Sequence, residues 1–246
     1  MHNEQTLPSF APLTADLGFY PVLPDAQWVE RVLQWGVRSV QLRFKPTLGN
    51  DADAQLQVRA AVAAGRAVAG AQVFINDHWQ LAMAEGAYGV HLGQEDLAHA
   101  NLGAIRAAGL RLGVSTHACW EVCRAAALRP SYIACGPIHA TRLKAMPWTP
   151  QGEDNLAHWC ELLGTPVVAI GGMDAARARA AMRCGAAGVA VAGAIVGSPT
   201  PEAAIAELTK HVAIGRADWA RGDRHAAPAL PMATLAPMMR QRCTPA

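Results

Sequence analysis

The chain is poor in charged and aromatic residues. Of its 246 residues, 16% are charged, 6% are aromatic and 52% are hydrophobic. The formal net charge of +2 gives no basic field that would attract nucleic acid and no acidic tail. No run of about 18 apolar residues occurs, so no transmembrane helix is expected. The composition is that of a protein with a sizeable core, and at this length an α/β barrel often forms a single domain.

Motifs for metal binding and for export are also missing. The six cysteines, at positions 119, 123, 135, 160, 184 and 243, include no C-x-x-C pair. Cys119 and Cys123 are four residues apart on an expected helix, but two thiols alone do not make a zinc site. Residues 1–16 lack the apolar segment of a secretory signal. We therefore expect reduced thiols, a cytoplasmic location, and neither a membrane nor a nucleic-acid partner.

Short apolar segments alternate with helical patterns along residues 18–212. Strands are expected at residues 18–23, 39–44, 72–75, 89–91, 111–114, 132–135, 166–170 and 188–192. Each is followed by apolar residues at helical spacing. Eight such pairs predict a single (β/α)8 TIM barrel rather than an open doubly wound sheet, since no G-x-G-x-x-G follows the first strand. Residues 1–17 are expected to form an N-terminal extension, and residues 213–246 an irregular C-terminal one.

The second expected strand carries polar residues on one face. Side chains alternate along a strand, so Gln41, Arg43 and Lys45 share one face. Leu42 and Phe44 point the other way, toward the covering helices. Buried arginine and lysine are rare unless they are paired. An amide and two cations on a buried parallel strand therefore predict a site for a polar, anionic ligand.

Two carboxylates follow neighbouring strands. Asp77 comes after the third strand and Asp96 after the fourth, at the carboxyl end where barrels carry their chemistry. Either residue alone also fits a helix N-cap. Proteins usually hold Mg2+ with one or two carboxylates, water and phosphate oxygens. Together, and near Arg43 and Lys45, the two aspartates predict a Mg2+ ion that bridges to a phosphate.

Glycines follow the last two strands. Gly171-Gly172 and Gly193 stand where barrels often bind phosphate through backbone N–H groups, which glycine allows to approach closely. Lys144, in the long loop after the sixth strand, is a candidate ligand of a second phosphate. Ser115 is a candidate donor to an anion. The residues thus indicate a metal-dependent barrel enzyme that handles two phosphate groups.

These segments resemble the thiamine-phosphate synthase family. The matching blocks, in family order, are Val40-Gln-Leu-Arg-Phe-Lys45, Phe74-Ile-Asn-Asp-His-Trp79, Gly89 to Asp96, Gly113 to His117, Gly136 to Lys144, Gln151-Gly152 and Ala169 to Gly172. The resemblance covers residues 18–212. It implies that a hydroxymethylpyrimidine diphosphate and a thiazole phosphate are joined to thiamine phosphate. Diphosphate leaves first, and the thiazole nitrogen captures the resulting pyrimidine methylene cation.

The resemblance also implies roles for individual residues. The implied substrate contacts are Gln41, Leu42, Arg43, Phe44, Lys45, Asn76, Ser115, Thr141, Arg142, Leu143, Lys144, Gly172, Ala192 and Gly193. Asp77 and Asp96 are implied to hold Mg2+. Catalysis is assigned to Arg43, Lys45, Ser115 and Lys144, beside the diphosphate, where charge develops on the leaving group.

Two departures from the family pattern fall in the thiazole phosphate half. Leu143 replaces a second loop hydroxyl, and Gly193 stands where serine is usual. Three alternatives stay open: a thiazole tautomerase, a phosphosugar isomerase, and a non-catalytic ligand-binding barrel. The aspartate pair argues against the tautomerase. An isomerase needs a proton-transfer pair, and the histidines, His91 among them, are interpreted as structural. The oligomeric state is left open, and a homo-oligomer is compatible with the sequence.

We expect Leu143→Thr to lower the KM for the thiazole phosphate several-fold and to leave the KM for the pyrimidine diphosphate unchanged. A hydrogen bond contributes roughly 0.5–1.5 kcal/mol net, and up to about 3 kcal/mol when one partner is charged. Steady-state kinetics with each substrate varied in turn measures both constants. If neither Leu143→Thr nor Arg142→Ala changed acceptor binding, this loop would not contact the phosphate.

Overall fold

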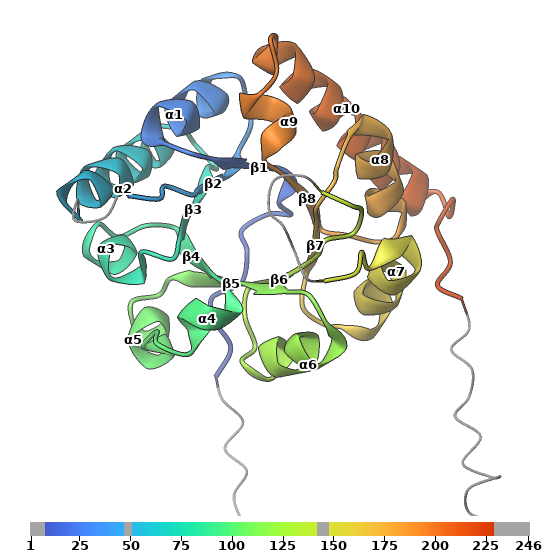
Figure 1. The fold of residues 1–246 in the computed structure, drawn as a ribbon, viewed down its shortest axis with the longest axis horizontal. Coiled ribbons are helices and arrows are strands. Elements are labelled where there is room, and N and C mark those ends of the chain that lie inside the picture. The colour runs from blue at the N-terminus through green and yellow to red at the C-terminus, as the bar shows by residue number, and fades with distance from the viewer. Residues whose placement is uncertain (1–7, 47–50, 142–147, 229–246) are drawn as a thin grey trace, which may run out of the picture.

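Eight parallel strands form a closed barrel in sequence order (Figure 1). The computed structural model describes residues 8–46, 51–141 and 148–228 of the chain. The strands are β1 Gly18–Leu23, β2 Ser39–Leu42, β3 Gln72–Asn76, β4 Gly89–Leu92, β5 Arg111–Thr116, β6 Tyr132–Cys135, β7 Val167–Ile170 and β8 Gly188–Val191. β8 pairs with β1, from Gly188 opposite Gly18 to Val191 opposite Pro21, and this pairing closes the barrel. The predicted (β/α)8 fold is confirmed.

Helices surround the barrel on the outside (Figure 1). They are α1 Ala26–Gln34, α2 Asp51–Arg66, α3 Trp79–Ala84, α4 Gln94–Leu97, α5 Leu102–Ala107, α6 Cys119–Ala127, α7 Gly152–Leu162, α8 Ala175–Arg183, α9 Gly193–Val196 and α10 Pro201–Ala220. The short helices α4 and α9 were not expected, because four residues cannot display a helical period. In the described part of the chain, no helix is both long and apolar enough to span a lipid bilayer.

Aromatic rings fill the inside of the barrel. The Tyr20 ring packs edge to face against the Tyr132 ring, with 5.9 Å between the ring centroids. The Phe74 ring packs against Tyr132 in the same way, with 5.2 Å between the centroids. The neighbouring strands make room with glycine. A Cβ at Gly89 would lie 2.6 Å from the Phe74 ring, and one at Gly113 would lie 2.1 Å from the Tyr132 ring. Large residues on some strands and glycines on others therefore produce one packed interior.

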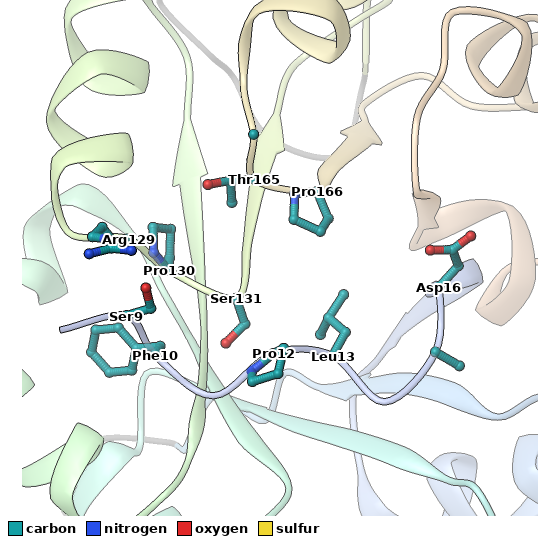
Figure 2. Close-up of a pocket in the computed structure, with 12 residues that line it drawn as sticks. Ser9, Phe10, Pro12, Leu13, Asp16, Arg129, Pro130, Ser131, Thr165 and Pro166 are labelled. Carbon is teal, nitrogen blue, oxygen red and sulfur yellow. The ribbon is translucent and has the colours of Figure 1, made fainter.

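Residues 8–17 close the amino end of the barrel. The Phe10 N–H donates to the Arg129 carbonyl oxygen at 3.0 Å, and the Ser131 Oγ donates to a carbonyl oxygen of the segment at 2.6 Å. The Phe10 side chain is buried. Figure 2 shows the segment running past Ser131 and Pro166, around a hollow of about 560 Å³. The described part of the N-terminal extension thus belongs to the folded unit.

The C-terminal helix is longer than expected. Residues 213–220 were predicted to be irregular, but they continue α10 to Ala220. Asp218, which is buried, accepts hydrogen bonds from Arg179 Nε at 2.7 Å and from an Arg221 nitrogen at 2.6 Å. Gly215 is also buried against α8. The apolar pattern ends early because this contact is made by a small residue and by a buried carboxylate paired with two partly exposed arginines.

Gly215→Ala tests the contact between α8 and α10. A Cβ there would lie 2.4 Å from the Arg179 carbonyl oxygen and 2.8 Å from Met182 Cβ, so the helices would have to separate. We expect the free energy of unfolding to fall by roughly 1–3 kcal/mol, measured by urea denaturation.

The matched control is Gly103→Ala, at an exposed position of helix α5. The nearest atom to a Cβ there is Asn101 Oδ1 at 3.4 Å. Since alanine has a helix propensity about 0.8–1.0 kcal/mol better than glycine in a helix interior, this variant should be as stable as the parent or more so. Equal losses in both variants would contradict a specific close contact at Gly215.

Candidate active site

A cavity of about 610 Å³ opens at the carboxyl end of the barrel. All eight strands or the residues that follow them contribute to its lining. The predicted site residues that line it are Gln41, Arg43, Asn76, Ser115, Thr141, Gly172, Ala192 and Gly193. Because α/β barrels carry their chemistry at this end, the cavity is the candidate active site.

The remaining predicted residues fall into three places. Lys45 forms an ion pair with Asp77 beside the cavity. The side chains of Leu42 and Phe44 are not part of the lining, because they pack into the layer between strands and helices. The side chains point away from the cavity, as strand alternation requires, so the predicted substrate contacts of Leu42 and Phe44 are left to their main-chain atoms and stay predictions. Arg142, Leu143 and Lys144 lie outside the described residues.

Asp77 has an uncommon backbone conformation. Its φ of 61° lies in the left-handed region, which is rarely occupied except by glycine, asparagine and aspartate. The Asp77 N–H donates to the His91 carbonyl oxygen at 3.0 Å, and this bond ties the turn to β4. Strained residues of this kind persist where the surrounding structure holds them, and they cluster at functional sites. The turn brings the Asp77 carboxylate to Asp96 and Lys45.

The carboxyl groups of Asp77 and Asp96 lie within hydrogen-bond reach of one another, so each affects the ionisation of the other. Burial raises the pKa of Asp96, and the hydrogen bond and negative charge of Asp77 raise this pKa further. Burial also opposes ionisation of Asp77, but hydrogen bonds from Lys45 and Asp96 outweigh it and lower the pKa of Asp77. Asp77 therefore loses its proton more readily than Asp96. Two such oxygen ligands beside the cavity fit a hard divalent cation.

A chain of hydrogen bonds crosses the floor of the cavity. Gln41 Nε2 donates to the Tyr20 hydroxyl at 3.2 Å, and this hydroxyl is 2.8 Å from that of Tyr132. The Tyr132 hydroxyl is 2.7 Å from His91 Nδ1, and His91 Nε2 is 2.7 Å from Ser115 Oγ. When Tyr132 donates to His91 Nδ1, the ring donates from Nε2 to Ser115. The Ser115 O–H is then available as a donor to a ligand in the cavity.

His91 is held neutral. Burial lowers the pKa of His91 to about 4. The negative charge of Asp77 raises this pKa and the positive charge of Arg43 lowers it, but both effects are smaller than that of burial. A neutral imidazole has one donor and one acceptor nitrogen, and both are engaged with Tyr132 and Ser115. His91 was interpreted as structural, and the geometry agrees, but the ring also orients Ser115. No sequence signal indicated that the Tyr20 and Tyr132 hydroxyls take part in this hydrogen-bond chain, because both residues occupy apolar positions of their strands.

Backbone groups form the wall of the cavity after β7 and β8. Gly171 and Gly172 have φ angles of 99° and 64°, and a Cβ at Gly172 would lie 2.5 Å from the Ala140 carbonyl oxygen. No side chain fits between this turn and the loop after β6. Gly193, at the start of α9, also contributes only backbone. The wall is suited to contact an anion by main-chain N–H groups.

A polar cavity with a cationic side chain, a backbone wall and an adjacent carboxylate pair is typical of barrel enzymes that bind phosphorylated ligands. The sequence profile described as "Thiamine monophosphate synthase" matches residues 21–195. The chain therefore belongs to the thiamine monophosphate synthase family.

Individual relatives agree with this assignment. A thiamine-phosphate synthase from Escherichia coli O1:K1 / APEC is 48% identical over 209 residues, which are 85% of this chain and 98% of the relative. A relative of the same name from Shigella flexneri has the same identity and coverage. The solved thiamine phosphate pyrophosphorylase from Pyrococcus furiosus aligns with a TM-score of 0.70 and 26% identity, over 81% of this chain and 97% of that one.

Tyr132→Phe tests the hydrogen-bond chain. The change leaves the Tyr20 hydroxyl and His91 Nδ1 without their buried partner, so we expect a loss of roughly 1–3 kcal/mol in unfolding free energy. Since Ser115 then loses its fixed orientation, kcat should fall as well. Thermal unfolding and steady-state kinetics measure the two effects.

Tyr88→Phe provides the control. The Tyr88 hydroxyl bonds to Gln72 and Thr14 at the amino end of the barrel, away from the cavity. We expect this variant to lose stability and keep its kcat. If both phenylalanine variants kept full kcat, the chain from Gln41 to Ser115 would have no part in catalysis.

Proposed function

We propose that this chain is an enzyme that joins 4-amino-2-methyl-5-(diphosphooxymethyl)pyrimidine and a thiazole phosphate to give thiamine phosphate and diphosphate. The observation that carries the proposal is the convergence of Arg43 and Ser115 on one cavity, with the Asp77–Asp96 pair beside it, next in the chain to the lining residue Asn76. The family assignment and the 48% identity to thiamine-phosphate synthases support it.

The diphosphate would bind on the side of β2 to β5. Arg43 and Asn76 line this part of the cavity, and the hydrogen bond from His91 aims the Ser115 hydroxyl toward it. Asp77 and Asp96 would hold Mg2+, which when bound neutralises charge on the departing diphosphate. Lys45, held by Asp77, adds a cation near the same oxygens. These groups stabilise negative charge as the carbon–oxygen bond breaks.

The pyrimidine would lie deeper, against Gln41. This amide is buried and held through its nitrogen by Tyr20. An amide is suited to both a donor and an acceptor on a heterocycle. The walls around it include Val22, Ala134 and Ile170, which are apolar. Such walls keep water away from the methylene cation, so that the thiazole nitrogen is the nucleophile that reaches it.

The thiazole phosphate would contact the backbone wall after β7 and β8, at Gly172, Ala192 and Gly193. This assignment follows from the missing side chains and from the position of phosphate sites in other barrels. Thr141 also lines the cavity next to this wall. Contacts from Arg142, Leu143 and Lys144 remain predictions from the sequence.

The alternatives fit less well. A tautomerase does not need a metal ion, so it would not require the neighbouring carboxylates of Asp77 and Asp96. An isomerase needs a free acid–base group, but His91 has both nitrogens engaged. We also propose a cytoplasmic location, in keeping with the unpaired state of the five described cysteines.

Asp77→Asn and Asp96→Asn test the metal and the reaction together. Asparagine tolerates the left-handed backbone of residue 77, so the fold should be kept. We expect kcat to fall roughly a hundredfold to a thousandfold, the size of losing one group that stabilises transition-state charge. The Mg2+ concentration needed for half-maximal rate should rise. Turnover with both substrates, followed across a Mg2+ titration, measures both effects.

Asp25→Asn is the matched control. Asp25 caps α1 at the same end of the barrel, where its Oδ1 accepts from the Trp28 N–H at 2.8 Å. Asparagine caps about as well as aspartate, so neither stability nor activity should change. If Asp77→Asn turned over at the wild-type rate in the presence of a chelator, the proposed role of Mg2+ would be wrong.

A further inference from the structure

Three side chains of metal-ligand type meet on the outside of the barrel. Glu153 lies in the first turn of α7, Cys184 follows α8, and His225 follows α10. A carboxylate oxygen, the thiol sulfur and a ring nitrogen of these residues all lie within 4.8 Å of one another. None of the three lines the cavity at the carboxyl end. Figure 1 shows the segment after α10 passing beside α7.

We propose that Glu153, Cys184 and His225 bind one transition-metal ion of the Zn2+ class. Zinc takes thiolate, imidazole and carboxylate ligands at about 2.0–2.3 Å in a tetrahedron, which places neighbouring ligand atoms roughly 3.3–3.8 Å apart. His225 Nδ1 is 3.7 Å from Glu153 Oε2, already near this separation. A small movement of the Cys184 sulfur toward the other two ligand atoms would complete three of the four coordination positions of the metal. A water molecule would occupy the fourth position.

The orientation of the His225 ring points to a ligand. His225 Nε2 is 2.7 Å from Asp154 Oδ1, a distance that suits an N–H donor to the carboxylate. This bond leaves the lone pair on Nδ1, the atom that faces Glu153. Metal-bound histidines almost always donate their other ring N–H to a carboxylate or carbonyl in this way. The backbone N–H of His225 donates to the Arg183 carbonyl oxygen at 2.9 Å and fixes the position of the ring.

The surroundings favour a cation. Besides Glu153, the carboxylate of Asp154 is close by, and Arg183, whose charge acts on Cys184, is already paired with Asp223. Cys184 is buried, and its Sγ donates to the Glu153 carbonyl oxygen at 3.6 Å. On binding, the S–H proton goes to solvent and the sulfur bonds to the metal.

The proposed ion would tie three separate elements together. α7, α8 and the segment after α10 each provide one ligand, and the last of these is also held by the ion pair of Arg183 and Asp223. An ion that binds the folded chain and not the unfolded one stabilises the fold. The site has sulfur and nitrogen ligands, so it is chemically distinct from the oxygen ligands of Asp77 and Asp96 and independent of the proposed reaction.

Cobalt provides the test, because Zn2+ is d10 and Co2+ takes the same tetrahedral ligands with a visible spectrum. The full chain is stripped with a chelator, exchanged into buffer and titrated with Co2+. We expect one equivalent with tetrahedral d–d bands and a thiolate-to-cobalt charge-transfer band. Zn2+ should displace it, and should raise Tm by several degrees.

The variants separate this site from the other candidates. Cys184→Ser and His225→Gln should each lose the charge-transfer band and the rise in Tm, and Asp154→Asn should weaken binding about 10–100-fold. Cys123→Ser, at an exposed thiol of α6, and Asp77→Asn should keep both signals. Circular dichroism of the metal-free variants checks that each is folded, and His225→Gln carries the test if Cys184→Ser is not. Absence of the band from the parent protein, or its persistence in Cys184→Ser, would overturn the proposal.

Discussion

The Tyr132 side chain joins the packing of the barrel to its chemistry. Its ring fills the space that Gly113 leaves open, and its hydroxyl lies between the Tyr20 hydroxyl and His91. A buried hydroxyl is costly without a partner, so this position requires polar neighbours on β1 and β4. The same requirement continues to Ser115, at the cavity floor. The interior of the barrel therefore sets the direction of a donor that faces the ligand.

Above this floor, charge is arranged by backbone geometry as much as by side-chain choice. The left-handed turn at Asp77 brings its carboxylate to Asp96 and Lys45, and the left-handed turn at Gly172 removes side chains from the opposite wall. One side of the cavity thus suits a cation with a diphosphate, and the other suits a phosphate held by main-chain groups. This division fits the proposed reaction, in which two phosphorylated substrates would meet between the two sides.

Segments outside the eight repeats hold the barrel at both ends of the chain. Residues 8–17 cover the amino end, opposite the cavity, and α10 continues to Ala220 along α8. The α8–α10 contact depends on Gly215, which allows the close approach, and on Asp218, which is paired with two arginines. His225 then reaches α7. These segments place titratable groups on the outer surface, far in sequence from the residues they meet.

The sequence by itself determined the eight strand–helix units and the polar residues at their carboxyl ends, because alternation and helical period are local signals. It also indicated the pairing of Asp77 with Asp96, since neighbouring parallel strands end at the same rim. Only the tertiary structure decided that α10 extends past residue 213 and that His91 orients Ser115. The first depends on a glycine and a buried carboxylate paired with two arginines, which have no apolar period. The second depends on contacts between side chains of different strands, and a sequence pattern does not encode which atoms will lie 2.7 Å apart.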